Sequence, residues 1–115
     1  MFKINPQMTE PVEASNLIPK SHFTSADVSE STSAFFEAPD HSVGAGVWEC
    51  GPCKVDIEAY PVNEMMTIIS GALTMIDEQG CEEHFGPGEV VFVAKGAKLT
   101  WHITERLRKY YMTSA

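Results

Sequence analysis

The strongest constraint on the fold is a series of short alternating segments, separated by glycine- and proline-containing turns, that runs from Ser42 onward. Alternation of apolar and polar residues over a few positions predicts β-strands rather than helices. The expected strands are 43–49, 54–60, 64–70, 72–76, 81–85, 89–94, 99–104 and 108–112. Many short strands with such turns predict an all-β sandwich or a closed barrel.

The two ends of the chain differ in composition. Residues 1–41 are rich in Ser, Thr, Pro and acidic side chains and contain only brief apolar groups, so they predict an N-terminal arm that packs on the barrel. Residues 42–115 contain all of the expected strands and predict the barrel itself. A chain of 115 residues is too short for a second independent core, so we expect a single domain.

Charge and apolar content exclude several classes of partner. The net charge is −8, with sixteen acidic and eight basic residues, which opposes binding to nucleic acid and to anionic membrane surfaces. There is no apolar run long enough to cross a bilayer and no apolar segment typical of a secretory signal. Three cysteines do not suggest a secreted disulfide scaffold, so we expect a cytoplasmic protein with reduced thiols.

Two segments have the spacing of a known pair of motifs. In the first, Glu58-Ala59-Tyr60 is followed by Glu64 after three residues and by Gly71 after six more. In the second, Gly88 is followed by Ala94-Lys95-Gly96 and then by Leu99. This spacing resembles the two motifs of the cupin superfamily, in which histidines stand where this chain has Glu58, Tyr60 and Leu99.

Further short motifs resemble one group of small single-domain cupins, those similar to ureidoglycine aminohydrolase and to ethanolamine-utilisation protein Q. The resemblance covers residues 43–112 in order. It rests on Gly46-Val47-Trp48-Glu49, Asn63-Glu64, Ile69-Ser70-Gly71, Gly86-Pro87-Gly88-Glu89, Thr100-Trp101-His102 and Leu107-Arg108-Lys109. It implies the cupin double-stranded β-helix, a jelly-roll barrel.

The resemblance also implies a pocket, because the metal-ligand positions of a cupin point into the barrel. Glu58, Tyr60 and Glu64 are then expected to face the cavity, with Trp101 opposite and Lys109 near the interior. These five residues are the expected ligand-binding set. Buried carboxylates are costly unless they are paired, so Lys109 is the expected partner of the acidic groups.

A metal cofactor is not expected. The usual cupin set is rich in imidazole, and the corresponding positions here offer oxygen atoms only. The alternative is a weakly held divalent cation at Glu58, Tyr60 and Glu64. His102 follows Trp101 directly, so strand alternation predicts that it lies on the surface.

Three functions remain open. The acidic and aromatic pocket predicts binding of a small polar or cationic metabolite, an amine or a ureide. The first alternative is an enzyme of the hydrolase or isomerase type, with Glu64 and Lys109 as an acid–base pair and Tyr60 as an orienting group. The second alternative is a non-catalytic structural or partner-binding module with a packed barrel. Whether the protein is an enzyme is left open.

Two further features concern thiols and assembly. Cys50-Gly51-Pro52-Cys53 resembles the thioredoxin motif, but a strand rather than a helix follows it, so we expect a β-turn whose thiols have no redox role.

Strand alternation that points Glu58 and Tyr60 inward leaves Val55, Ile57 and Ala59 on the outside. That apolar row predicts a homodimer. Phe92 is expected in the core, and the alternative is that it belongs to the aromatic wall of the pocket.

Overall fold

The structure of the protein, a computed structural model, describes residues 13–14 and 30–115. Within them the backbone forms β-strands and no helix. The strands are β1 (Glu13–Ala14), β2 (Ser31–Glu37), β3 (Val43–Cys50), β4 (Cys53–Ile57), β5 (Asn63–Asp77), β6 (Glu82–Phe85), β7 (Val90–Val93) and β8 (Leu99–Ser114). A membrane-spanning helix is not found in these residues.

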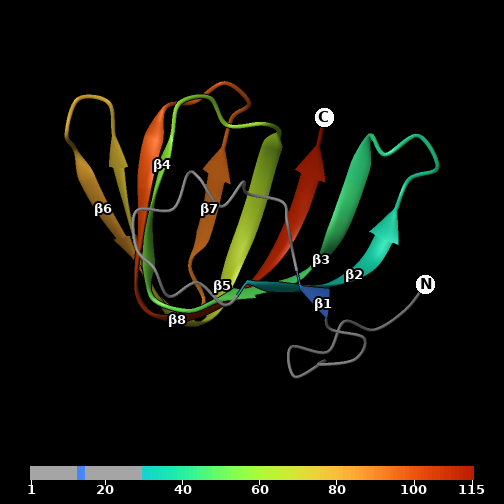
Figure 1. Ribbon diagram of the computed structural model, residues 1–115, viewed down its shortest axis with the longest axis horizontal. Helices are drawn as coiled ribbons and strands as arrows, with labels where there is room; N and C mark the ends of the chain where they lie inside the picture. The colour runs from blue at the N-terminus through green and yellow to red at the C-terminus, as the bar shows by residue number, and fades with distance from the viewer. Residues whose placement is uncertain (1–12, 15–29) are drawn as a thin grey trace.

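Two long strands hold the barrel together. β5 and β8 are antiparallel neighbours from the Asn63–Ser114 pair to the Asp77–Leu99 pair. The first half of β5 also pairs with β7 and its second half with β6, while β8 pairs with β4 near its start and with β3 near its end. Both long strands therefore pass from one side of the barrel to the other (Figure 1). The predicted all-β jelly-roll barrel is confirmed.

The bend in β5 is centred on Gly71. The pairing with β8 shifts its register between Ile68 and Leu73, and Gly71 has φ of 91°. A Cβ atom at Gly71 would overlap the backbone carbonyl of Arg106 on β8. Glycine is the residue that tolerates both this torsion and this close approach, so it allows one continuous strand to turn the corner. The sequence pattern had predicted two separate strands here, and likewise two in place of β8.

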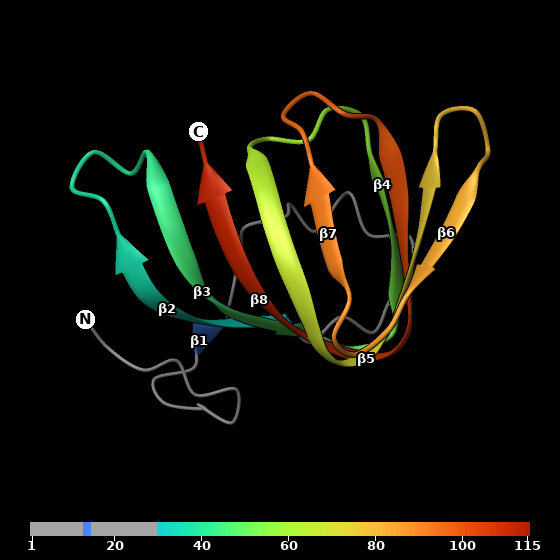
Figure 2. The same ribbon diagram turned by 180° about the vertical axis from the view of Figure 1, so that it is seen from behind.

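The N-terminal side of the barrel is extended by β2. This strand pairs with β3, and β1 pairs with β2, so residues 31–37 of the predicted arm form part of the sheet (Figure 2). Residues 1–12 and 15–29 of the predicted arm lie outside the described residues. The division of the chain at residue 41 stays a prediction.

The core consists of side chains that alternate along the strands. On β4, Cys53, Val55 and Ile57 are buried, whereas Lys54 and Asp56 are exposed. The other members of the core are Trp48, Cys50, Tyr60, Met66, Ile68, Leu73, Met75, Val91, Val93, Trp101, Ile103 and Leu107. They line one interior shared by both sides of the barrel, which is the arrangement a jelly roll requires.

Candidate functional site

The barrel contains a cavity of about 650 Å³ beside its core. Its wall is formed by β2, β3, β5 and β8 and by the segment that joins β4 to β5. Four of the residues predicted from the sequence line it: Tyr60, Glu64, Trp101 and Lys109. A volume of this size accommodates a small metabolite.

A buried ion pair lies at the wall of this cavity. Lys109 Nζ donates a hydrogen bond to Glu64 Oε2 at 2.6 Å, and the Tyr60 hydroxyl donates to Glu64 Oε1 at 2.7 Å. Lys109 is 3% exposed and Glu64 is 7% exposed. Both carboxylate oxygens are thus bonded, which is the condition under which a charged pair tolerates burial.

Two tryptophans complete the surroundings of the ammonium group. Lys109 Nζ lies 4.7 Å from the ring centroid of Trp48 and 4.4 Å from that of Trp101. The two indoles meet edge to face, with centroids 5.7 Å apart. A cation over two aromatic faces is attracted by both ring quadrupoles, and the attraction is larger where water is excluded. The chain's own lysine therefore fills a cation–π box.

The register of the sheet explains why these side chains meet. Lys109 on β8 lies opposite Trp48 on β3 and opposite Ile68 on β5, so its side chain points inward between them. Tyr60 lies in no strand. Its backbone is held by hydrogen bonds from its own N–H to Ala97 O and from Gly96 N–H to Tyr60 O, both 2.8 Å long. The turn thus aims the phenol at Glu64.

Burial and the neighbouring carboxylate both act on Tyr60. Burial raises the pKa of its phenol, and the negative charge of Glu64 together with the hydrogen bond to it raises the pKa further. The phenol stays protonated at neutral pH and acts as a hydrogen-bond donor to Glu64 rather than as a base.

Uncharged hydroxyl groups line the wall away from the ion pair. Thr32 on β2 donates to Val47 O at 3.2 Å, and its hydroxyl lies 3.3 Å from that of Tyr111 on β8. Thr113, also on β8, donates to Gly44 O at 3.5 Å. All three hydroxyl-bearing residues line the cavity, so a ligand there meets groups that both donate and accept hydrogen bonds.

Glu58 does not belong to the site. Its side chain is 84% exposed and forms a surface ion pair with Lys98 at 3.5 Å. The prediction assumed strict alternation from residue 54 to 60, but β4 ends at Ile57 and the chain bends at residues 58 and 59. Tyr60 therefore turns inward while Glu58 follows the outer face of β4.

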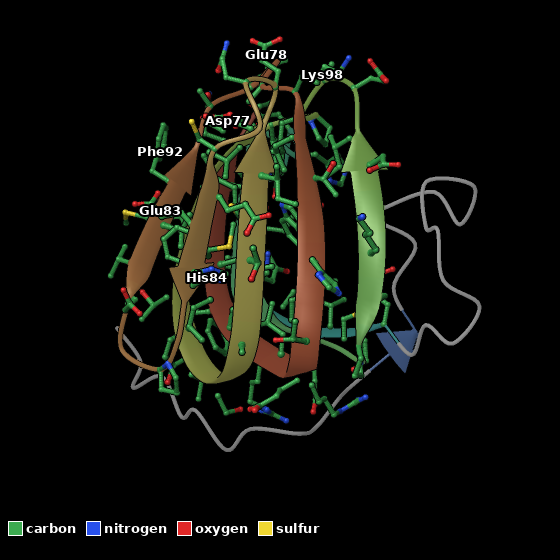
Figure 3. The ribbon with its side chains drawn as sticks, turned by 90° about the vertical axis from the view of Figure 1, so that its left-hand side faces the viewer. Asp77, Glu78, Glu83, His84, Phe92 and Lys98 are labelled. Atoms are coloured by element: carbon green, nitrogen blue, oxygen red, sulfur yellow. The ribbon has the colours of Figure 1, made fainter. Side chains whose placement is uncertain are left out.

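Two other expectations about side-chain orientation are wrong. Val55 and Ile57 are 0% and 6% exposed, so these two members of the apolar row that motivated the homodimer lie in the core, whereas Ala59 is exposed. Phe92 was expected in the core or the aromatic wall, but it is 65% exposed and extends away from β7 (Figure 3). Its neighbours Val91 and Val93 supply the core contacts instead. The predicted surface position of His102 agrees with its exposure.

A metal ion does not fit this site. Glu58 is outside the cavity, and both oxygens of Glu64 already accept hydrogen bonds, one of them from a lysine ammonium that would repel a cation. The described residues contain no cluster of three or more His, Cys, Asp or Glu side chains suited to a metal. Glu58, Tyr60 and Glu64 therefore do not converge on one point at which a divalent cation could be held.

The two cysteines of the Cys50–Cys53 turn lie close together in the core. Their sulfur atoms are 3.7 Å apart, and both are free thiols. The contact with Cys53, followed by burial, raises the pKa of the Cys50 thiol, and the same contact lowers that of Cys53. β4 follows the turn, so the helix N-terminus on which thioredoxin chemistry depends does not occur there.

Sequence reasoning missed several residues of the cavity, above all Trp48. It was noted only as part of a motif, although alternation with Cys50 on β3 places both on the inner face. Thr32 was missed because it lies in the part of the chain interpreted as an arm. Leu99, which stands at the histidine position of the second cupin motif, lines a different cavity of about 490 Å³ next to β6 and β7.

Comparison with solved structures supports the fold. A protein of unknown function from Pseudomonas syringae pv. tomato, assigned to the DUF861 family, superposes with a TM-score of 0.87 at 24% identity; the match covers 96% of this chain and 46% of that one. The chain thus spans less than half the length of that protein. The EutQ protein of Clostridium difficile gives 0.65 at 23% identity, with 82% and 76% of the two chains covered.

A third structure, the polyketide cyclase RemF from Streptomyces resistomycificus, gives a TM-score of 0.69 at 14% identity and covers 99% of this chain and 79% of its own. At these identities the likeness concerns the fold. A search of curated proteins by sequence gives no match. The sequence model of the EutQ-like cupin domain, however, matches residues 37–111, which is well over half of the chain. The chain is therefore a member of the EutQ-like cupin family.

Proposed function

We propose that this cupin binds a small, uncharged polar metabolite of the ureide or amide type in the cavity beside Lys109. The observation that carries the proposal is the buried Tyr60–Glu64–Lys109 network at the wall of a cavity of about 650 Å³. A network of this kind, placed next to open space rather than inside a packed core, supplies fixed polar groups for a ligand. Small-molecule binding in general agrees with the cupin fold.

Charge distinguishes the ureide from the amine. The negative charge of Glu64 is neutralised by Lys109, and the faces of Trp48 and Trp101 are occupied by the same ammonium. A cationic ligand beside those rings would be repelled by the Lys109 ammonium, and Glu64, already paired with Lys109, would not be free to bind it. An uncharged ligand with both donors and acceptors avoids this repulsion.

The wall chemistry favours the same class. The hydroxyl groups of Thr32, Tyr111 and Thr113 are neutral and adaptable, and they suit the paired N–H and C=O groups of ureides and amides. Such a ligand gains these hydrogen bonds without removing a buried charge from its partner.

Calorimetric titration with a panel of substituted ureas, primary amides, alkylamines and sugars tests the proposal. We expect heat and saturable binding for members of the urea and amide groups and none for alkylamines of the same size. Tryptophan fluorescence should change on binding, because Trp48 and Trp101 line the cavity. Saturable binding confined to the alkylamines, or to none of the panel, contradicts the proposal.

A blocked variant shows whether a bound compound occupies this cavity. Ala34 on β2 lines the cavity and is exposed, so Ala34→Trp fills space without disturbing the core. Thr104→Trp adds the same bulk at an exposed position of β8 that does not line the cavity. Binding should be lost in the first variant and kept in the second. Equal affinity in both would place the ligand elsewhere.

An enzymatic role is the second candidate. Its support is the continuous hydrogen-bonded chain from Tyr60 through Glu64 to Lys109, which could move a proton at a substrate held in the cavity. Glu64→Gln removes the carboxylate and keeps its shape. Hydrolase or isomerase activity on a compound found by titration should fall by at least about a hundredfold in that variant. Unchanged activity would remove Glu64 from the reaction and leave a binding or structural module.

The proposal also concerns the setting of the protein. Because this chain has a net charge of −8, a small molecule is a more favourable partner for it than nucleic acid or an anionic membrane. A cytoplasmic location is proposed because a reducing compartment keeps adjacent thiols such as Cys50 and Cys53 free. Fractionation of cells that make the protein tests this location.

A further inference from the structure

The turn between β2 and β3 brings two titratable side chains to the cavity beside Lys109. Glu37 is the last residue of β2, and His41 lies in the turn that follows. Both line the cavity of about 650 Å³. Their side chains are 60% and 76% exposed, so they lie where this cavity opens to water.

Backbone hydrogen bonds hold this turn in place. Ala38 O accepts a hydrogen bond from His41 N–H at 2.8 Å, and Pro39 stands at the second position of the turn, where its fixed φ is favourable. At the other end of the chain, Ala115 N–H donates to Ser42 O at 2.8 Å. The turn is thereby attached to the end of β8, beside the C-terminus (Figure 2).

His41 has a backbone conformation that is uncommon for histidine. Its φ is 61°, and among the described residues it is the one non-glycine residue with a positive φ. Hairpin turns usually place Gly, Asn or Asp at such a position, because these residues adopt it at low cost. A departure from this rule without a gain in stability is typical of a functional position.

Glu37 orients the imidazole ring of His41. The Nδ1 atom of His41 lies 2.5 Å from Oε1 of Glu37. Because a carboxylate only accepts hydrogen bonds, Nδ1–H is the donor, and Nε2 then has a lone pair. Within residues 30–115 the ring has no second hydrogen-bond partner. An imidazole held by a carboxylate with Nε2 available is the arrangement of a general base.

The cavity extends from this turn to the buried ion pair. On β3 and β8, Gly44 lies opposite Thr113 near the turn, and Trp48 lies opposite Lys109 further inside. All four residues line the cavity. Gly44 and Trp48 are four residues apart, which corresponds to about 13 Å along a strand. A ligand longer than urea itself can therefore lie between the ion pair and His41.

We propose that His41, held by Glu37, is a general base that activates water for the hydrolysis of a substituted ureide or amide bound in this cavity. The inference rests on the proposed function, from which it takes the ligand class. Glu64 is less suited to the role, because both of its oxygens already accept hydrogen bonds. A base at the mouth of the cavity has access to the water that hydrolysis consumes.

Water is the co-reactant of the proposed step. His41 Nε2 takes a proton from water while the water oxygen attacks the carbonyl carbon. The carbon–nitrogen bond then breaks, and the imidazolium returns the proton to the departing nitrogen. The products are an amine or ammonia and a carboxylic or carbamic acid. Glu37 remains a carboxylate throughout and stabilises the imidazolium, so it is a positioning residue.

Hydrolysis of 4-nitrophenyl acetate tests the base, because this neutral carbonyl compound reacts fast enough to be followed by absorbance. His41→Gly should lower the rate at least about tenfold, and added imidazole should restore part of it. His102→Gln removes an exposed histidine of β8 that does not line the cavity and should keep the wild-type rate. Equal rates in wild type and His41→Gly would overturn the proposal.

Two further measurements separate catalysis from a structural role. Glu37→Gln should lower kcat severalfold and leave KM unchanged, because the ring loses its orientation but the cavity keeps its shape. His41→Gly should be at least as stable as the wild type in thermal unfolding, since glycine adopts φ of 61° readily. A clear loss of stability in His41→Gly, or a change in KM alone in Glu37→Gln, would assign a structural role and overturn the proposal.

The site of hydrolysis and the ligand class are checked separately. Ala34→Trp, which fills the cavity, should abolish the His41-dependent rate, and Thr104→Trp should keep it. Calorimetric titration with N-butylurea should show binding to wild type and to His41→Gly alike. If neither protein binds any urea or amide, the proposed function fails and this inference with it. If both bind but ester hydrolysis does not depend on His41, this inference alone fails.

Discussion

The ammonium group of Lys109 lies 2.6 Å from Glu64, and both side chains are almost fully buried beside a cavity and two tryptophan rings. The two side chains form an ion pair inside the barrel. Its two charges depend on each other, because neither is in contact with bulk water. Stability and ligand choice should both respond when one of them is removed.

Replacing Lys109 with Met should strongly destabilise the protein. The variant leaves the Glu64 carboxylate buried with a single partner, Tyr60, and breaking one half of a buried ion pair costs about 3 to 5 kcal/mol. Urea denaturation of Lys109→Met and of wild type measures the loss.

The matched control is the double variant Lys109→Met/Glu64→Met, which removes both charges and keeps similar volume. Apolar replacement of a whole buried pair is often neutral, so the double variant should be more stable than Lys109→Met alone by about 2 kcal/mol or more. Equal stability of the single and double variants would mean that the carboxylate is not isolated in the single variant.

Replacing Gly71 with Ala should disrupt the corner of β5. The new Cβ atom meets the Arg106 carbonyl, and φ of 91° is unfavourable for Ala. Gly88 is a matched control, because it has φ of 88° with no atom within 4 Å of an added Cβ. Gly88→Ala should cost about 1 to 2 kcal/mol from the torsion alone, and Gly71→Ala at least about 2 kcal/mol more. Thermal unfolding of both variants gives the comparison, and similar losses would contradict the steric argument.

The fold could be predicted because turn chemistry and alternation are local properties. The Gly86–Gly88 turn and the alternating residues of β4 indicate strands regardless of how these pair. The same alternation favours Val55 and Ile57 as the inward residues, because Lys54 and Asp56 are charged. The motif resemblance placed Glu58 inward instead, and the bend after Ile57 decides where Glu58 points.

The site could be predicted in part for a related reason. Tyr60, Glu64, Trp101 and Lys109 were found through a family resemblance that relates distant positions, and the structure brings these four together. The role of Trp48 in the cation–π box depends on its register opposite Lys109, which no local pattern contains.

The three cysteines should differ in reactivity. Cys81 is exposed, whereas Cys50 and Cys53 are buried, and the pKa of Cys50 is raised by its contact with Cys53 and by burial. A chromogenic disulfide reagent should therefore label one thiol rapidly in the native protein and the other two only after unfolding. Cys81→Ser should lose the rapid phase. Rapid labelling that persists in this variant would show that the turn opens in the native state.

Tyr60 should make the protein sensitive to alkali. Its pKa is raised in the folded state, so the folded protein keeps a proton that the unfolded chain releases above about pH 10. The corresponding stabilisation is complete below that pH and is lost as the pH rises, by up to about 1.4 kcal/mol per pH unit. In Tyr60→Phe the free energy of unfolding should fall less steeply between about pH 10 and 11. Parallel curves for the two proteins would contradict this account.

Removing the lysine side chain should convert the site into one for cations. Lys109→Ala leaves the carboxylate of Glu64 and the faces of Trp48 and Trp101 around a space shaped like an alkylammonium chain. Added n-butylamine, charged at neutral pH, should occupy that space and restore stability. At about ten times its dissociation constant it should contribute about 1.4 kcal/mol, which raises the melting temperature by about 4 °C or more.

Two comparisons make this rescue specific to the proposed geometry. The wild type should not be stabilised by n-butylamine, because its own ammonium fills the box. Lys109→Ala/Glu64→Gln keeps the space but lacks the carboxylate, so its response to the amine should be much smaller. An uncharged compound of similar length, n-butanol, should rescue Lys109→Ala poorly. If n-butylamine stabilises all three proteins equally, the amine acts elsewhere, and the view that Lys109 occupies a cation site has to be abandoned.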